Sequence, residues 1–122
     1  MFGKPKKQSD RNKAYRSHLK NLMVLAMADG HLDLGEEHLL IAIAHRLGLS
    51  EDDIADIRNN LDDIEFRLPS HYDDRIEQLH DLFTLMSIDG HIDEEELEMC
   101  RELGHKYELT HTVIEEMIRK FI

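Results

Sequence analysis

The sequence predicts an all-α fold, a single bundle of about six helices built from two pseudo-symmetric three-helix units. Three observations lead to this prediction. Apolar residues recur three or four positions apart along the chain, no segment shows sustained period-two alternation with β-branched residues, and part of the sequence repeats at an offset of 60 residues. The length of 122 residues is usual for one domain with its own core.

Each expected helix is marked by one apolar stripe, and small or polar residues mark the breaks between stripes. Gly30 and Gly90 follow the first and fourth stripes, where a left-handed glycine would end a helix. Ser50 precedes three acidic residues and is a good N-cap for the third helix. Pro69 breaks the chain midway, and Ser70 is expected to cap the fourth helix. The stripes cover residues 15–26, 39–47, 54–64, 76–86, 97–107 and 114–121.

An internal repeat divides the chain into two similar units. Residues 21–57 align with residues 81–117 without gaps. The repeated core is an acidic turn, with the sequence DGHLDLGE at residues 29–36 and DGHIDEEE at residues 89–96. The repeat predicts pseudo-symmetric units but leaves open whether the two acidic turns lie near each other.

Charge is distributed unevenly along the chain. The net charge is −11, yet residues 1–20 hold seven Lys or Arg and one Asp, so this segment carries +6 and the remainder −17. We expect a basic flexible arm over residues 1–12 and a helical domain over residues 13–122. Residues 4–20 are a candidate for peripheral contact with an anionic membrane, with loose pairing to the acidic domain as the alternative. We expect a protein partner and no nucleic acid, and the oligomeric state stays open.

Cysteine usage and hydropathy indicate a cytoplasmic protein. The single cysteine, Cys100, excludes an intrachain disulfide framework and CxxC motifs. No apolar run approaches the ~20 residues needed to span a bilayer. No apolar segment follows the charges of the N-terminus, so we expect no signal peptide.

The acidic turns have a structural interpretation that needs no ligand. Asp33 and Asp93 are placed to cap the helices that follow them. Glu36 and Glu96 stand at the third position of those helices, as in a capping box. Capping therefore accounts for these carboxylates, whereas the first aspartate of each turn stays unexplained.

Those first aspartates suggest a cation site. Asp29 and Asp89 are expected at helix C-termini, where the macrodipole disfavours negative charge by roughly 0.3–1 kcal/mol. Residues 21–45 and 76–100 contain no Lys or Arg that would offset it. Three neighbouring carboxylates without a cationic side chain favour Ca²⁺ or Mg²⁺, which prefer oxygen ligands. The candidate metal ligands are Asp29, Asp33, Glu36, Asp89, Asp93 and Glu96.

The spacing matches only the second half of an EF-hand loop. Leu25 and Met27, at the first and third loop positions, cannot supply carboxylates, and the second copy has Leu85 and Ser87 there. Water, carbonyls or the other turn must therefore complete the six to eight ligands of Ca²⁺, and we expect weak binding, on the order of 10⁻⁴–10⁻³ M.

Other site chemistries have weaker support. His31 and His91 beside the acids are candidate Zn²⁺ ligands, although Zn²⁺ is the less favoured ion. The His80-Asp81 pair is similar to a motif of metal phosphohydrolases but lies mid-helix without partner residues at suitable spacing. Cys100 belongs to an apolar stripe and is expected to be a buried hydrophobe rather than a nucleophile. The six methionines are expected in the core, with a Met-rich binding groove as the alternative.

The motif ADGHLDxxE at residues 28–36 has a second copy, IDGHIDxxE, at residues 88–96. Both resemble the signature of the TerB-like tellurite-resistance family. A related domain precedes the J-domain of a membrane-anchored DnaJ-like co-chaperone. The resemblance covers roughly residues 15–118 and departs from the family at Leu34-Gly35 and at the two histidines of the turns. It implies an all-helical TerB-like fold, a metal-binding acidic surface formed by the six acids above, and stress-response complexes near a membrane.

These observations predict a non-enzymatic, divalent-cation-sensitive binding module of the TerB-like type, in a stress-response or membrane-proximal complex. The alternative is a metal-free acidic domain that docks a basic protein. A small metal-dependent hydrolase is the third and weakest hypothesis, because it requires an enclosed pocket lined by carboxylates and histidines.

Overall fold

The computed structural model describes residues 10–27, 33–88, 90 and 92–122, and every regular element within them is helical. This confirms the predicted all-α bundle of six helices. The helices are α1 (Asp10–Ala26), α2 (Leu34–Arg46), α3 (Glu51–Asn59), α4 (Tyr72–Met86), α5 (Glu94–Lys106) and α6 (His111–Phe121), with a 3₁₀ turn at Leu61–Asp63.

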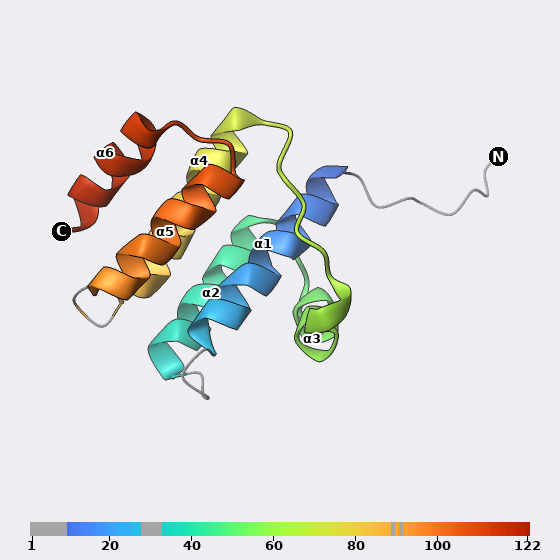
Figure 1. Cartoon of the computed structure of the whole chain (residues 1–122). Coiled ribbons are helices and arrows are strands. Elements are labelled where there is room, and N and C mark those ends of the chain that lie inside the picture. Colours follow the sequence, from blue (N-terminus) through green and yellow to red (C-terminus); the bar gives the residue numbers. More distant parts are fainter. Residues whose placement is uncertain (1–9, 28–32, 89, 91) are drawn as a thin grey trace.

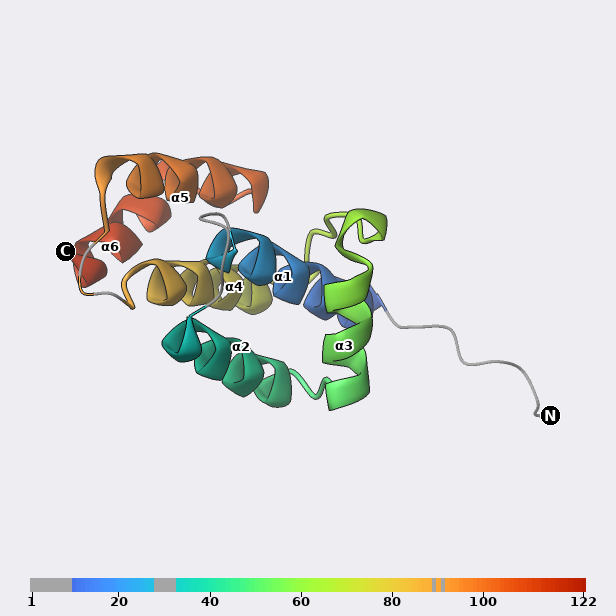
Figure 2. The ribbon, with the colours of Figure 1, turned by 90° about the horizontal axis from the view of Figure 1, so that it is seen from below.

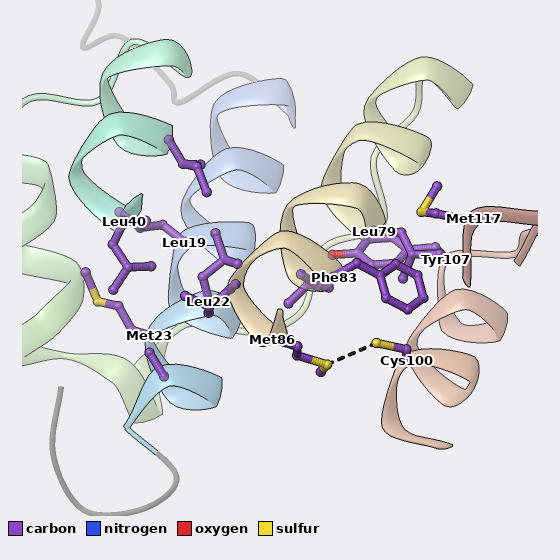
Figure 3. Packing of buried hydrophobic residues seen from close by; sticks show 14 of the residues in the cluster. Leu19, Leu22, Met23, Leu40, Leu79, Phe83, Met86, Cys100, Tyr107 and Met117 are labelled. Atoms are coloured by element: carbon purple, nitrogen blue, oxygen red, sulfur yellow. Dashed lines mark hydrogen bonds between the residues drawn. The ribbon is translucent and has the colours of Figure 1, made fainter. Parts of the chain in front are cut away.

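The two long helices α1 and α4 pack against each other at the centre of the bundle (Figures 1 and 2). On one side α2 and α3 pack against α1, and on the other α5 and α6 pack against α4. One apolar cluster runs through all these interfaces, and Leu22, Leu79, Phe83 and Tyr107 within it are fully buried (Figure 3). The central helices therefore join both halves of the chain into one bundle.

The third helix ends earlier than its apolar stripe predicts. α3 stops at Asn59, and the continuation of the stripe to residue 64 as one helix is wrong. The side-chain Nδ2 of Asn60 donates to the carbonyl of Asp56 at 2.8 Å and so takes the acceptor that the next helical turn would use. Leu61 and Ile64 still pack against the core, but from a 3₁₀ turn and an extended segment.

The start of α4 also differs from the prediction. The N-cap is His71 rather than Ser70, and its side chain makes no capping hydrogen bond. The predicted cap at Ser50 is confirmed, and Thr110, which matches Ser50 in the repeat, caps α6 in the same way: each side chain accepts a hydrogen bond from a backbone N–H in the first turn.

Matching Schellman motifs end α2 and α5. Leu49 N donates to Ala44 O at 2.9 Å after α2, and Leu109 N donates to Gly104 O at 3.1 Å after α5. The left-handed residue is Gly48 in the first motif, with φ of 78°, and Glu108 in the second, with φ of 60°. Glycine adopts this conformation without a steric penalty, whereas glutamate does not.

Replacing Glu108 with glycine should therefore raise the free energy of unfolding by about 0.5–1 kcal/mol. The relief of backbone strain stabilises the folded state, and the greater chain entropy of glycine in the unfolded state cancels part of that gain. The ion pair lost with Arg75 is long, at 3.7 Å, and exposed, so it contributes little. Urea denaturation measures the change. Gly48→Ala, the reverse change at the matching position, should destabilise, and equal effects of the same sign would contradict this explanation.

The two units differ in how the third helix of each packs. α3 packs mainly on α1, whereas α6 packs on both α4 and α5. A Cβ added to Gly104 would lie 2.6 Å from Ile114 Cγ1, so the glycine allows α5 and α6 to approach closely. The first unit has Ala44 at the matching position. Capping and Schellman motifs repeat between the units, while overall pseudo-symmetry remains a prediction.

Candidate functional site

Both acidic turns end in a capping box. Asp33 Oδ1 accepts from Glu36 N at 2.8 Å, and Glu36 Oε1 accepts from Asp33 N at 3.2 Å. The second copy has the same bonds, from Glu96 N to Asp93 Oδ1 at 2.8 Å and from Asp93 N to Glu96 Oε1 at 3.1 Å. The predicted caps are thus confirmed at both turns. Each bond engages one oxygen of its carboxylate, so Oδ2 and Oε2 take no part in the cap.

The capping carboxylates stay accessible to solvent. Asp33 and Asp93 are exposed, and Glu96 is half-buried. Within the described part of the chain, no Lys or Arg forms an ion pair with Asp33, Asp93 or Glu96. Asp33, Asp93 and Glu96 therefore carry negative charge that no ion pair with Lys or Arg neutralises within the described part of the chain.

The remaining predicted ligands, Asp29 and Asp89, lie outside the described residues, as do His31 and His91. Within the described ranges, no three His, Cys, Asp or Glu side chains are grouped so that they could hold a metal ion. Because each predicted site needs one undescribed aspartate, the cation site remains a prediction.

The helix ends that flank the two turns lie at the same end of the bundle. Figures 1 and 2 show the last turns of α1 and α4 beside the first turns of α2 and α5. A Cβ added to Gly35 would lie 3.6 Å from Asp33 Oδ1 and 3.7 Å from Ile88 Cδ1. The start of α2 therefore contacts the residue that precedes the second acidic turn, and Leu34 and Ile88 are exposed there. We call this end of the bundle, with Asp33, Glu36, Asp93 and Glu96, the acidic end.

Basic residues near the N-terminus bind the chain's own acidic domain. Arg11 donates to both carboxylate oxygens of Asp74, at 3.0 and 3.1 Å. Arg16 pairs with Asp53 at 3.1 Å and also with Asp56. Helix α1 begins at Asp10, inside the predicted flexible arm of residues 1–12. Within the described part of residues 4–20, two of the basic side chains predicted to contact a membrane therefore form ion pairs inside the protein.

A buried polar network joins α1, α2 and α4. Asp81 lies on α4 and is almost fully buried. Its Oδ2 is 2.8 Å from His18 Nε2 on α1, and its Oδ1 accepts from Arg46 Nη1 on α2 at 3.0 Å. Arg46 also lies 3.4 Å from Glu77. Hydrogen bonds from His18 and Arg46 outweigh the effect of burial and hold the pKa of Asp81 below its ordinary value.

His18 is neutral in this network. Complete burial lowers the pKa of His18 below its ordinary value of 6.5, and this effect outweighs the hydrogen bond to Asp81, which raises it. The neutral ring therefore donates its Nε2–H to the carboxylate. Its Nδ1 is then an acceptor, and no described residue donates a hydrogen bond to it.

Acidification should destabilise the fold through His18. Below pH 6.5 the unfolded chain binds a proton at His18 that the folded protein resists, so stability is lost as the pH falls from 6.5 towards the lower folded pKa. We expect the free energy of unfolding to fall by about 1 kcal/mol between pH 7 and pH 5.5. Urea titrations at both pH values measure it. The His18→Gln variant should show a smaller fall, and an equal fall would assign the effect to other groups.

The weaker catalytic hypotheses find no support in the geometry. Asp81 points into the core, whereas His80 is exposed and packs edge-to-face on Phe121, so the two do not form a shared metal site. Cys100 is fully buried, its thiol lies 3.0 Å from Met86 Sδ (Figure 3), and burial raises its pKa to about 12. A thiol so protonated is a poor nucleophile, as the apolar stripe predicts.

The buried network is the feature that the sequence analysis missed. A signal for it exists in the repeat, because His18 matches Gln78 and Asn21 matches Asp81 at the same offset of 60 residues. His18, Gln78 and Asp81 are buried, and the amide nitrogen of the partly buried Asn21 is itself buried. Each central helix therefore places two polar residues, three positions apart, on a face that packs inside the bundle.

The comparisons with known proteins identify one family. A family model described as tellurite resistance protein TerB matches residues 4–59, which include α1, the first acidic turn, α2 and α3. Searches of curated proteins and of solved structures gave no match. Among the described residues, no helix is both long enough and apolar enough to cross a membrane. Over residues 4–59, just under half of the chain, and in its all-helical fold, the chain is similar to the TerB tellurite-resistance family.

Proposed function

We propose that this TerB-like protein is a non-enzymatic binding module whose acidic end binds a divalent cation, Ca²⁺ or Mg²⁺ in preference to Zn²⁺, and whose contacts with a protein partner respond to that cation. The cation would bind through Asp29, Asp33 and Glu36 in one turn and Asp89, Asp93 and Glu96 in the other. A stress-response or membrane-proximal complex fits the family.

The observation that carries this proposal is the placement of two capping boxes at one end of the bundle. The caps fix the backbone at Asp33 and Asp93, where the two turns end, and use one oxygen of each capping carboxylate. An oxygen-preferring cation requires several such oxygens near each other. The contact between the start of α2 and Ile88 supports a position in which the two turns contribute to one acidic surface.

Calorimetry with Ca²⁺, Mg²⁺, Mn²⁺ and Zn²⁺ tests the proposal. We expect a dissociation constant on the order of 10⁻⁴–10⁻³ M for a preferred ion, weakened at least tenfold in the Asp29→Asn/Asp89→Asn variant, because fewer charged ligands remain. The Asp52→Asn/Asp62→Asn variant changes the charge equally at exposed positions elsewhere and should bind as the wild type does. Absence of heat and of a melting shift with every ion would remove the cation from the proposal.

A metal-free acidic interaction domain is the second candidate, because capping alone accounts for Asp33, Glu36, Asp93 and Glu96. In that case partner binding should weaken steeply with salt and persist in EDTA. Loss of the complex on chelation would count against this candidate and in favour of the first.

A further inference from the structure

An apolar groove lies between α1 and α5. Its volume is about 300 Å³. Val24 and Met99 are large apolar side chains on its two walls and are 49% and 41% exposed, while Leu82 of α4 is fully buried beneath. We call it the α1–α5 groove; its lining is Lys20, Asn21, Val24, Leu25, Leu82, Met99 and Leu103.

The groove exists because the two units close this interface differently. Arg46 of α2 reaches Asp81 of α4 and holds that pair of helices together. The matching residue of α5 is Lys106, and the position that matches Asp81 on α1 is the neutral Asn21. Lys106 instead lies over the ring of Phe66, 4.5 Å from its centroid. Without a charged pair between them, α1 and α5 leave their apolar side chains accessible.

The α5 wall of the groove carries negative charge. Glu95 and Glu102 lie four residues before and three residues after Met99, so all three share one face of the helix. Both glutamates are exposed, and no cation among the described residues pairs with either. Arg101 is directed away from this face and bonds Glu115 of α6 at 2.9 Å. Lys20, at the groove edge, donates to the carbonyl of Ile64 at 2.7 Å.

We propose that the α1–α5 groove docks a basic amphipathic helix of a partner protein. Apolar side chains on one face of that helix would fill the space between Val24 and Met99, and Lys or Arg beside them would pair with Glu95 and Glu102. Methionine suits such a surface because its flexible, polarisable side chain adapts to different apolar partners. This docking site goes beyond the proposed cation site and uses none of its carboxylates.

A fluorescent synthetic peptide of Leu at helical spacing with Lys at the other positions is the probe, and its anisotropy is measured in EDTA so that the cation proposal is tested separately. The wild-type chain should bind this peptide. It should bind neither a peptide with Glu in place of Lys nor a scrambled peptide of equal charge. The Val24→Ala/Met99→Ala variant should bind at least tenfold more weakly. The control Tyr72→Ala/Ile122→Ala removes exposed apolar side chains elsewhere and should leave binding unchanged.

The contribution of the two glutamates beside the groove is tested with the Glu95→Gln/Glu102→Gln variant, which should bind the peptide about threefold more weakly and with a smaller salt dependence. The matched control is Glu51→Gln/Glu116→Gln, at exposed positions on α3 and α6. Circular dichroism establishes that each variant folds.

Several results would overturn the docking site. Equal binding of the scrambled peptide, or no effect of the Val24→Ala/Met99→Ala variant, would show that charge alone attracts the probe. Binding that occurs only after residues 1–9 are deleted would assign the groove to the chain's own N-terminus. A concentration-dependent dimer in sedimentation that the same variant abolishes would assign it to a second copy.

Discussion

Replacing Asp81 with alanine should lower the free energy of unfolding by about 2–4 kcal/mol, because it removes the buried acceptor that the fully buried His18 shares with the partly exposed Arg46. His18 Nε2–H would lose its hydrogen-bond partner inside the bundle, and the Arg46 guanidinium would lose its nearest carboxylate. The network links α1, α2 and α4, so the substitution would weaken the contact between the two halves of the bundle.

Urea denaturation followed by circular dichroism measures this effect, together with a melting temperature expected to fall by roughly 10–20 °C for a domain of this size. The control is Glu77→Gln. Glu77 contacts the same arginine, but at 3.4 Å and with its side chain 53% exposed, so its replacement should cost less than about 1 kcal/mol. If Asp81→Ala fails to fold, the nearly isosteric Asp81→Asn should show a smaller loss; equal stability of the Asp81 and Glu77 variants would refute a structural role for the network.

Replacing Gly104 with alanine should lower the free energy of unfolding by about 1–2 kcal/mol, although the same change stabilises an ordinary helix by about 1 kcal/mol. The new methyl group would meet Ile114 Cγ1 and Cδ1 at 2.6 Å, and Ile114 is fully buried, with little room to move. The cost of overpacking therefore exceeds the gain in helix propensity.

A double-mutant cycle isolates this clash. Ile114→Ala alone should cost about 2–5 kcal/mol, because it leaves a cavity. In the double variant, Gly104→Ala should be neutral or stabilising, which gives a coupling energy of at least about 1 kcal/mol between the two positions. Additive effects would mean that α5 and α6 do not depend on the glycine for their close approach.

The fold was predictable because its signals are local. A serine or aspartate followed three residues later by an acid determines its own capping box, as at Asp33, Ser50 and Asp93. Stripes of apolar residues located the helices, except where Asn60 ended α3 early by bonding a backbone carbonyl. That competition between side chain and backbone leaves the apolar spacing unchanged, so the spacing could not indicate it.

The polar network could not be predicted in the same way. His18 and Asp81 are 63 residues apart, and their pairing follows from the packing of α1 on α4 rather than from either local sequence. The pairing of Arg46 with Asp81 likewise depends on how α2 crosses α4. The capping role of the acidic turns was predictable, whereas a shared cation depends on Asp29 and Asp89, which lie outside the described residues.

The most direct test of the proposed cation site at the acidic end is Mn²⁺ titration of the ¹⁵N-labelled protein observed by NMR. The first turn of α3, with Glu51, Asp52 and Asp53, is a built-in control in the Arg16→Gln variant, which lacks the cation that pairs with Asp53, because it is a capped acidic helix start without a preceding acidic turn. At substoichiometric Mn²⁺ we predict broadening of amide signals around Glu36 and Glu96 before those of α3. Equal broadening at all three helix starts would show only a diffuse negative surface and would contradict a bound cation at the acidic end.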